Sequence, residues 1–210
     1  MVKILIADDH AIVRKGLVQI LADSSAVIVV DEAADGNEAL AKADGGDFDL
    51  VLLDISMPGR GGLDVLKEMK SRNPRLPVVI LSMYPEDQYA VRAIRCGASG
   101  YLTKASASDN LLQAINKVLR GGRYISSSLA EQLAESLDNN TDKALHETLS
   151  NREFQVLHMI GAGMTVSGIA AEMSLSVKTI STFRTRVLKK MKMKNNSELT
   201  HYAISNKLVE

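Results

Sequence analysis

Short apolar runs alternate with longer amphipathic stretches through the first 120 residues of this chain, and this alternation limits the possible folds. Most of the runs are continuously apolar and rich in Val, Ile and Leu, which is typical of parallel strands buried on both faces. The predicted strands are residues 2–7, 27–33, 50–53, 77–81 and 100–102. The helices predicted from apolar periodicity are residues 12–21, 36–43, 62–70, 87–95 and 108–119.

Five strand–helix units in succession predict a doubly wound α/β domain with a five-stranded parallel sheet and helices on both faces. We expect the flavodoxin-like strand order 2-1-3-4-5, in which the first and third strands are neighbours.

The pattern changes after Gly121 and Gly122, which interrupt the last helix of the α/β domain. One further helix is predicted over residues 128–137, and the polar cluster at 138–142 is typical of a flexible linker. From Ser150 onward the periodicity is helical, with no strand signal. We therefore predict an α/β domain at 1–123, a helical and flexible linker at 124–148, and a small all-α domain at 149–210.

The charges are balanced overall but unevenly distributed. Residues 1–123 carry 15 Lys/Arg and 16 Asp/Glu, residues 124–149 carry 1 and 5, and residues 150–210 carry 9 and 4. The C-terminal domain therefore has a net charge of +5 and follows an acidic connector. A basic module favours a polyanionic partner, although ordinary surface charge would look similar.

The sequence points to a soluble cytoplasmic protein. Cys96 is the sole cysteine, so an internal disulfide is excluded and a reducing compartment is favoured. The apolar stretch at the N-terminus is too short for a signal-peptide core and ends in Asp8 and Asp9. No apolar run approaches the length needed to cross a membrane.

Acidic side chains lie where two neighbouring strands of the predicted sheet end. Asp8 and Asp9 follow the first strand and Asp54 follows the third, so their carboxylates should converge at the carboxyl edge, where ligands bind in such sheets. Clustered carboxylates stay ionised together only beside a cation, and an oxygen-only ligand set suits Mg²⁺. Ser82 and Lys104, after the fourth and fifth strands, would complete a phosphate site.

Asp54 lies centrally in this set and is the natural nucleophile toward phosphorus, which would give an aspartyl phosphate. Asp8 and Asp9 would then hold the metal. The alternative is that Asp8 and Asp9 cap the first helix, since Asp is a good N-cap residue. The whole set at strand ends favours the phosphate site.

Residues 1–121 resemble the receiver domain of two-component signalling proteins. The motifs that carry the resemblance are Ile6-Ala7-Asp8-Asp9-His10, Leu50-Val51-Leu52-Leu53-Asp54-Ile55-Ser56-Met57-Pro58, Leu81-Ser82 and Gly97-Ala98-Ser99-Gly100-Tyr101-Leu102-Thr103-Lys104.

The receiver resemblance implies specific roles. Asp54 would accept phosphate from a sensor histidine kinase, while Asp8, Asp9 and the Ser56 backbone carbonyl would join Asp54 in binding Mg²⁺. Ser82 and Lys104 would contact the phosphoryl group, and Tyr101 would be the aromatic switch residue. Receivers often have proline after the lysine, whereas this chain has Ala105.

The C-terminal domain begins with a predicted capping box, formed by Ser150 and Glu153. Its first helix ends at residues 161–163, and a second short helix spans 166–173 with Ile169, Ala170 and Met173 facing inward. A three-residue connection at 174–176 leads to a third helix that runs to about Met191. Two helices joined by such a turn indicate a helix-turn-helix.

The third helix has an apolar face and a basic, hydroxyl-rich face. The expected core residues are Ile180, Phe183, Val187, Leu188 and Met191. The opposite face has no acid, which favours contact with nucleic-acid phosphates over simple solvation. We expect Ser181, Thr182 and Thr185 to reach bases, and Lys178, Thr179, Arg186 and Lys189 to contact the DNA backbone.

Residues 149–208 resemble the DNA-binding domain of NarL/FixJ regulators, also called LuxR-type. The resemblance rests on Leu149-Ser150-Asn151-Arg152-Glu153, Ile169-Ala170-Ala171-Glu172-Met173, Leu175-Ser176-Val177-Lys178-Thr179-Ile180 and Arg184-Thr185-Arg186-Val187-Leu188-Lys189-Lys190-Met191. It implies a four-helix domain whose last helix, near 197–205, pairs two copies on DNA.

Together the two resemblances imply a transcriptional response regulator rather than a conventional enzyme, although it would take part in its own phosphotransfer and dephosphorylation. Phosphorylation of Asp54 would change dimerisation or interdomain contacts and so control binding to double-stranded DNA. The expected partners are a sensor histidine kinase, DNA and a second copy of the chain, with RNA polymerase as a further candidate.

Two other functions fit the sequence less well. A haloacid-type phosphatase would need an aspartate two residues after the nucleophile, and Ser56 occupies that position. A receiver with an RNA- or protein-binding tail would bind duplex DNA without sequence preference or not at all.

Overall fold

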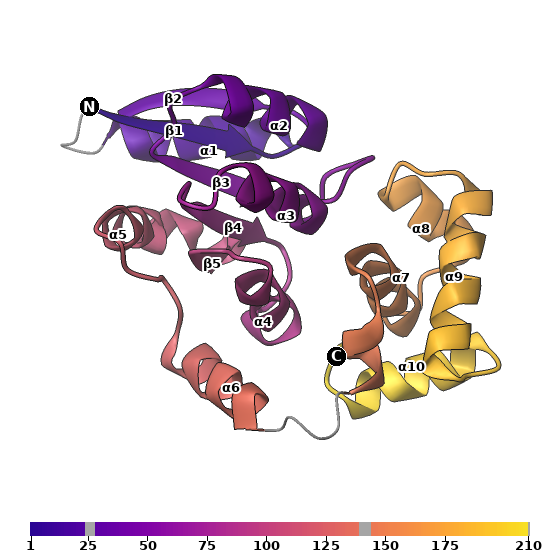
Figure 1. The fold of residues 1–210 in the computed structure, drawn as a ribbon. Coiled ribbons are helices and arrows are strands. Elements are labelled where there is room, and N and C mark those ends of the chain that lie inside the picture. Colours follow the sequence, from indigo (N-terminus) through magenta and orange to yellow (C-terminus); the bar gives the residue numbers. More distant parts are fainter. Residues whose placement is uncertain (24–27, 139–143, 210) are drawn as a thin grey trace. The chain divides into compact units, whose positions relative to one another are not determined.

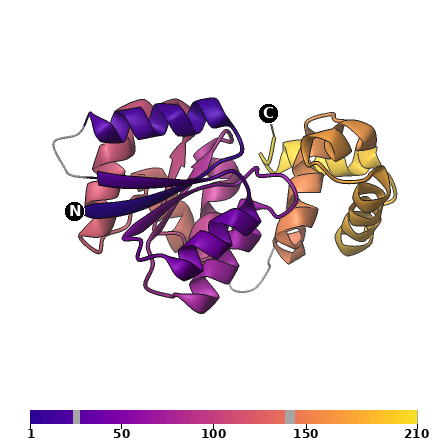
Figure 2. The ribbon, with the colours of Figure 1, turned by 90° about the horizontal axis from the view of Figure 1, so that it is seen from above.

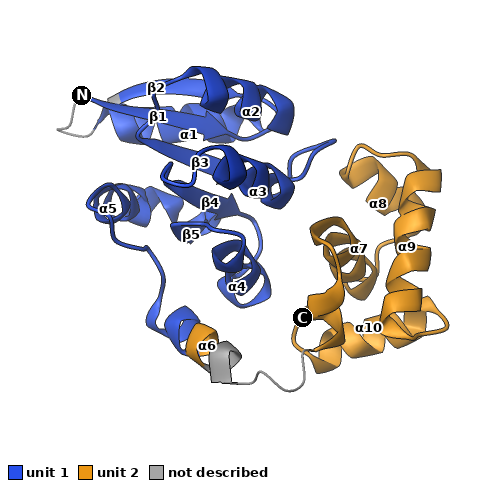
Figure 3. Ribbon diagram, in the orientation of Figure 1, with its two compact units in different colours: residues 1–131 blue, residues 132–210 orange. Residues whose placement is uncertain are grey.

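The computed structural model describes residues 1–23, 28–138 and 144–209 (Figure 1). Contacts divide the chain into two compact units, Met1–Glu131 and Gln132–Glu210 (Figure 3). The predicted flexible stretch lies mostly outside the described residues, because 139–142 are not among them.

The first unit contains five strands, β1 Val2–Ala7, β2 Ile28–Ala33, β3 Leu50–Asp54, β4 Val78–Ser82 and β5 Gly100–Thr103. They form one parallel sheet in the order 2-1-3-4-5, as predicted. The helices are α1 Ala11–Ala22, α2 Gly36–Gly45, α3 Gly62–Arg72, α4 Glu86–Arg95 and α5 Ala107–Leu119. Each predicted element is present, with bounds that shift by one or two residues.

The core of this unit lies on both faces of the sheet. Helices α1 and α5 pack over one face, where Leu17, Leu21, Leu111 and Ile115 meet alternate strand residues such as Leu52. Helices α2, α3 and α4 cover the opposite face (Figure 2). Because the strands are buried from both sides, their continuously apolar sequences are explained.

Two short features were not predicted. A 3₁₀ turn at Lys104–Ser106 (η1) connects β5 to α5, and Thr103 caps it by accepting from the Ser106 amide. Residue Tyr124, after α5, makes an isolated parallel bridge to Gly100 on β5. No peptide bond in the described ranges is cis, so the Lys104–Ala105 bond is trans.

After α5 the chain forms α6 Ser127–Asp138, which matches the helix predicted at 128–137. The second unit continues with a 3₁₀ turn at Leu145–Thr148 (η2), which apolar periodicity did not reveal. None of the described helices has the length and hydropathy required for a membrane crossing.

The four-helix domain that the sequence resemblance implies is present as α7 Asn151–Gly161, α8 Val166–Glu172, α9 Val177–Met191 and α10 Asn196–Ser205. The capping box of Ser150 and Glu153 is confirmed. Each later helix has a side-chain N-cap as well, at Thr165, Ser176 and Asn195. Such caps satisfy amide groups that would otherwise have no partner in a short helix.

The core of the helical unit includes Phe154, Leu157, Ile169, Ile180 and Val187, all buried. The predicted inward residues Ala170, Met173 and Met191 are buried too. Two residues assigned to the core face of α9, Phe183 and Leu188, are only half-buried. They lie at the margins of the apolar stripe, so a helical wheel overestimates their burial.

Helix α3 begins where the chain passes very close to β3, and this predicts a strict requirement for Gly62. A Cβ at that position would lie 1.9 Å from the Asp54 carbonyl oxygen and 2.8 Å from the Ile55 Cα. Backbone cannot yield as a flexible side chain can, so Gly62→Ala should lower the free energy of unfolding by about 3 kcal/mol.

Gly16 in the interior of α1 is the matched control, since a Cβ there would meet nothing within 4 Å. Gly16→Ala should raise stability by roughly 1 kcal/mol through helix propensity. Urea unfolding of the first unit measures both. Similar effects of the two substitutions would contradict the close approach at Gly62.

Candidate functional site

The sheet register brings Asp8 and Asp54 side by side at the carboxyl edge. Ala7 of β1 pairs with Leu53 of β3, so the next residue of each strand lies at the same level. Both carboxylates are completely buried, whereas Asp9 is half-buried. Ligand atoms of Asp8, Asp9, His10 and Asp54 all lie within 4.8 Å of one another. The three predicted acids therefore form one cluster.

Lys104 joins the two buried carboxylates from the end of β5. Its Nζ lies 2.9 Å from Asp54 Oδ2 and 2.7 Å from Asp8 Oδ2. Burial disfavours the ammonium, but the charges of Asp54 and Asp8 outweigh it and raise the pKa of Lys104. Burial raises the pKa of Asp54, and the neighbouring Asp8 charge adds to this, while Lys104 opposes it. One cation thus serves two buried anions.

The cluster has the properties of a cation site. Asp8 Oδ2 and Asp9 Oδ1 are buried and accept no hydrogen bond of good geometry. Lys104 Nζ and His10 Nδ1 do approach them, at 2.7 Å and 2.8 Å. A carboxylate oxygen inside a protein needs a partner, and several such oxygens together suit a hard divalent cation. The donor set present therefore fits the predicted metal.

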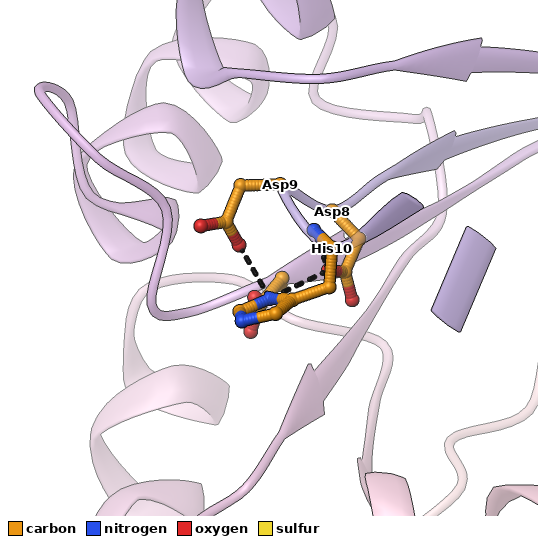
Figure 4. A group of neighbouring side chains, drawn as sticks. Asp8, Asp9 and His10 are labelled. Carbon is orange, nitrogen blue, oxygen red and sulfur yellow. Dashed lines mark hydrogen bonds and ion pairs between the residues drawn. The ribbon is translucent and has the colours of Figure 1, made fainter. Parts of the chain in front are cut away.

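His10 lies at the mouth of this cluster and was not assigned a role from the sequence. Figure 4 shows its ring beside Asp9 and Asp8, with Nδ1 2.8 Å and 3.3 Å from their Oδ1 atoms. Its side chain is 61% exposed, so it lies where the acidic cluster opens to solvent.

The alternative role of Asp8 and Asp9 as helix caps is not supported by the geometry. The N-cap of α1 is His10, whose side chain makes no capping bond. Asp8 Oδ1 instead accepts from the backbone amide of His10, before the helix begins.

The remaining predicted receiver residues surround the cluster. Ser82 ends β4, is buried, and its Oγ accepts from the Tyr84 amide at 3.0 Å. The Ser56 amide donates to Asp54 Oδ1 at 3.1 Å. Tyr101 is 3% exposed, and its hydroxyl donates to the Tyr84 carbonyl at 2.9 Å. Burial raises the pKa of Tyr101, while the nearby Ser82 hydroxyl opposes this.

In the second unit, α9 presents the predicted basic face to solvent. The exposed members are Lys178, Ser181, Thr182, Thr185, Arg186 and Lys189. Thr179 is half-buried, and its hydroxyl makes a 2.8 Å hydrogen bond with the side chain of the capping Ser176. The exposed face matches the prediction, and Thr179 is partly committed to the helix cap.

The threonine hydroxyls of α9 are already used as donors. Thr182 Oγ1 donates to the Lys178 carbonyl and Thr185 Oγ1 donates to the Ser181 carbonyl, both at 2.9 Å. A hydroxyl that gives its hydrogen to the backbone retains acceptor lone pairs. These two side chains therefore offer acceptors and methyl groups to a ligand.

One hydrogen bond and one ion pair that the sequence did not suggest hold α9 against its neighbouring helices. Arg184, which had no assigned role, donates through Nε to Asn196 Oδ1 at 2.6 Å and so connects α9 to the start of α10. Lys190 Nζ lies 2.6 Å from the buried Glu153 carboxylate on α7. Burial alone would raise the pKa of Glu153, but Lys190 and the Ser150 amide lower it overall.

Comparison with known proteins assigns both units to families. Residues 4–116 match the response regulator receiver domain, and residues 147–203 match the bacterial regulatory proteins of the luxR family. A receiver followed by a LuxR-type helix-turn-helix defines a response regulator that acts on transcription.

Similar proteins match the whole chain. Response regulator GacA of Pseudomonas syringae pv. syringae is 37% identical over 211 residues, which is 100% of this chain and 99% of GacA. Response regulator UvrY of Shigella flexneri is 35% identical over 209 residues, or 99% and 96% of the two chains. This chain belongs to the NarL/FixJ family of response regulators.

A solved structure of the same architecture is RcsB from Salmonella enterica serovar Typhimurium, bound to promoter rprA in the presence of the phosphomimetic BeF3⁻. It is 25% identical, with a TM-score of 0.64, and the match covers 98% of this chain and 100% of RcsB.

His158 on α7 predicts an acid-sensitive DNA-binding unit. Burial lowers the pKa of its imidazole to about 4, from an ordinary value of 6.5. An imidazole with a lower pKa in the folded state stabilises the fold above pH 6.5, and this stability is lost as the pH falls toward 4. At pH 4.5 the loss should be about 2 kcal/mol.

Unfolding of the second unit at pH 7 and pH 4.5 tests this, with His158→Gln as the comparison. The wild type should lose more stability on acidification than the variant, since carboxylates titrate equally in both. Parallel losses in the two proteins would show that His158 does not contribute.

Proposed function

We propose that Asp54 is the phosphoacceptor of this response regulator and that a sensor histidine kinase is the phosphoryl donor. The support is the buried arrangement of Asp8, Asp54 and Lys104, with one ammonium within 2.9 Å of both carboxylates. An Asp54 oxygen attacks the phosphorus of a phosphohistidine, the P–N bond breaks, and its electron pair returns to the imidazole of the kinase. The product is an aspartyl phosphate.

The other residues of the pocket would balance charge and orient the phosphoryl group during this reaction. Mg²⁺, bound by Asp8, Asp9, Asp54 and the Ser56 backbone carbonyl, would neutralise the carboxylates and bind phosphoryl oxygens. Lys104 leaves the Asp54 carboxylate and pairs with the phosphoryl group as a compact positive charge. The Ser82 hydroxyl donates to a phosphoryl oxygen, and Tyr101 follows Ser82 as the switch residue.

The α9 face carries the proposed DNA contacts. Lys178, Arg186 and Lys189 would contact phosphates, with Thr179 near the helix start. Ser181, Thr182 and Thr185 would reach base edges in the major groove. Since Thr182 and Thr185 offer acceptors and methyl groups, they suit the amino groups of adenine or cytosine and the methyl group of thymine.

Activation would act through dimers on DNA. RcsB has been seen as dimers bound to DNA, and the proposal here is that two copies of this chain bind together once Asp54 is phosphorylated. RNA polymerase would be the further partner in transcription. We propose boundaries of 1–123, 124–148 and 149–210 for the receiver, connector and DNA-binding domain. A cytoplasmic location fits the sole cysteine, Cys96.

Direct phosphorylation tests the first part. Incubated with acetyl phosphate and Mg²⁺, the protein should gain the mass of one phosphoryl group, and removal of the metal with a chelator should suppress the gain. Asp54→Asn should gain nothing, while Asp47→Asn, at an exposed acid, should behave as the wild type. Full phosphorylation of Asp54→Asn would show that another residue is the acceptor.

Substitutions on α9 test the DNA interface. Lys178→Ala should weaken binding to all duplexes alike and reduce the salt slope of binding by about 1, because one phosphate contact is lost. Thr182→Ala should instead change the ranking of base-pair variants by about 1–3 kcal/mol. Lys67→Ala, an exposed lysine on α3, is the charge-matched control. Equal losses from Lys67→Ala and Lys178→Ala would contradict the assigned face.

A further inference from the structure

The chain that leaves α5 is attached to the open edge of the sheet. β5 is the last strand in the order, and its outer side is met by Tyr124. The Tyr124 amide donates to the Ser99 carbonyl at 2.9 Å, and the Tyr101 amide donates to the Tyr124 carbonyl at 3.2 Å. We call residues 123–129 the strap. Its backbone covers an edge that would otherwise expose unpaired groups.

Three glycines and one side-chain contact explain why the strap lies against the sheet edge. Gly121, at φ +84°, turns the chain after α5, and the Gly122 amide donates to the Lys117 carbonyl. At Gly100 the strap comes so close that a Cβ would lie 3.0 Å from both the Cβ and the carbonyl oxygen of Tyr124. The Lys117 ammonium lies 5.9 Å from the centre of the Tyr124 ring. The strap is therefore a built contact of this unit.

The far end of the strap is attached to α4. The Ser126 amide lies 3.4 Å from Glu86 Oε1, and Ser126 Oγ accepts from the amide of Leu129 in the first turn of α6. Leu129 is 1% exposed, so the first turn of α6 is packed down as well. Glu86 is the first residue of α4. The strap thus connects two elements, β5 and the beginning of α4.

Both attachment points of the strap, at β5 and at α4, are connected to the Asp54 pocket by a short network of hydrogen bonds. The Ser82 hydroxyl holds the Tyr84 amide, and the Tyr101 hydroxyl holds the Tyr84 carbonyl. Glu86 follows Tyr84 by two residues, and Tyr101 carries one of the strap's backbone bonds. A cavity of about 400 Å³ adjoins this network, lined by residues that include Tyr101, Glu86, Lys117, Tyr124 and Ser126. It leaves room for the ring and the strap to move.

We propose that the strap is a latch that opens when Asp54 carries a phosphoryl group, an inference that rests on the function proposed above. When the Ser82 side chain rotates toward the phosphoryl group, the hydrogen bond between its Oγ and the Tyr84 amide breaks. The segment between Ser82 and Glu86 then shifts, Glu86 withdraws from Ser126, and Tyr101 moves with its ring into the cavity. The strap loses both attachments. A longer stretch of chain is then free to lead toward the DNA-binding unit.

Hydrogen exchange on the full chain, with and without Mg²⁺ and BeF3⁻, tests the latch. With the phosphoryl mimic, amides of the strap and the first turn of α6 should exchange at least about fivefold faster, since their local opening costs less. Peptides that contain Asp54 should become more protected. Protection at Asp54 without faster exchange in the strap would overturn the latch and leave the phosphoacceptor proposal intact. No response at either place would overturn both.

Thermodynamic linkage between strap opening and binding of the mimic gives a second test, in which the affinity for the mimic is measured. If the mimic opens the strap, then opening the strap must tighten binding of the mimic by the same factor. Gly100→Ala adds a Cβ that meets only Tyr124 among its three nearest atoms, so it pushes on the strap. It should speed exchange of the strap without ligand and lower the apparent Kd for BeF3⁻ by about threefold. Gly16→Ala is the matched control.

Glu86→Ala gives an independent variant in case Gly100→Ala does not fold. It removes the acceptor of the Ser126 amide, whereas Asp87→Ala removes an equal charge from the same first turn of α4. Only Glu86→Ala should speed exchange of the strap and tighten binding of the mimic. Faster exchange with unchanged affinity would show that the strap is not coupled to the pocket.

Discussion

Two buried carboxylates that share one ammonium are the constraint on which the rest of this protein depends. Asp8 and Asp54 are forced together by the pairing of β1 with β3, and Lys104 reaches both from β5. One positive charge cannot balance two buried negative charges, and Asp9 adds a third acid beside them. The negative charge of the pocket is therefore balanced only when a cation binds, and a phosphoryl group that pairs with Lys104 then binds favourably.

Much of this arrangement could be predicted from the sequence because its causes are local or periodic. The continuously apolar strands predict burial on both faces, and the parallel order then brings Asp8, Asp54, Ser82 and Lys104 to one edge. In the helical unit the capping box and the exposed basic face of α9 follow from spacing alone. The sequence also indicated the family, since ordered motifs at strand ends are far more specific than any single residue.

The features that escaped prediction depend on contacts between residues distant in the sequence. The bridge from Tyr124 to β5 is made by backbone groups, which leave no side-chain pattern in the sequence. The bond from Arg184 to Asn196 and the use of threonine hydroxyls as donors depend on how helices are packed and turned. Phe183 was predicted to lie in the core but is only half-buried, because a helical wheel gives the direction of a side chain and not the depth of its burial.

The central claim is that charge at Asp54 controls affinity at α9. A titration of duplex DNA at fixed salt, with and without Mg²⁺ and BeF3⁻, measures this directly when Asp54→Ala is run alongside. We predict that the mimic tightens DNA binding by about tenfold in the wild type, as expected for a coupling near 1.4 kcal/mol, and leaves the variant unchanged. Identical affinity under all conditions would contradict the account, because the receiver would then not control DNA binding.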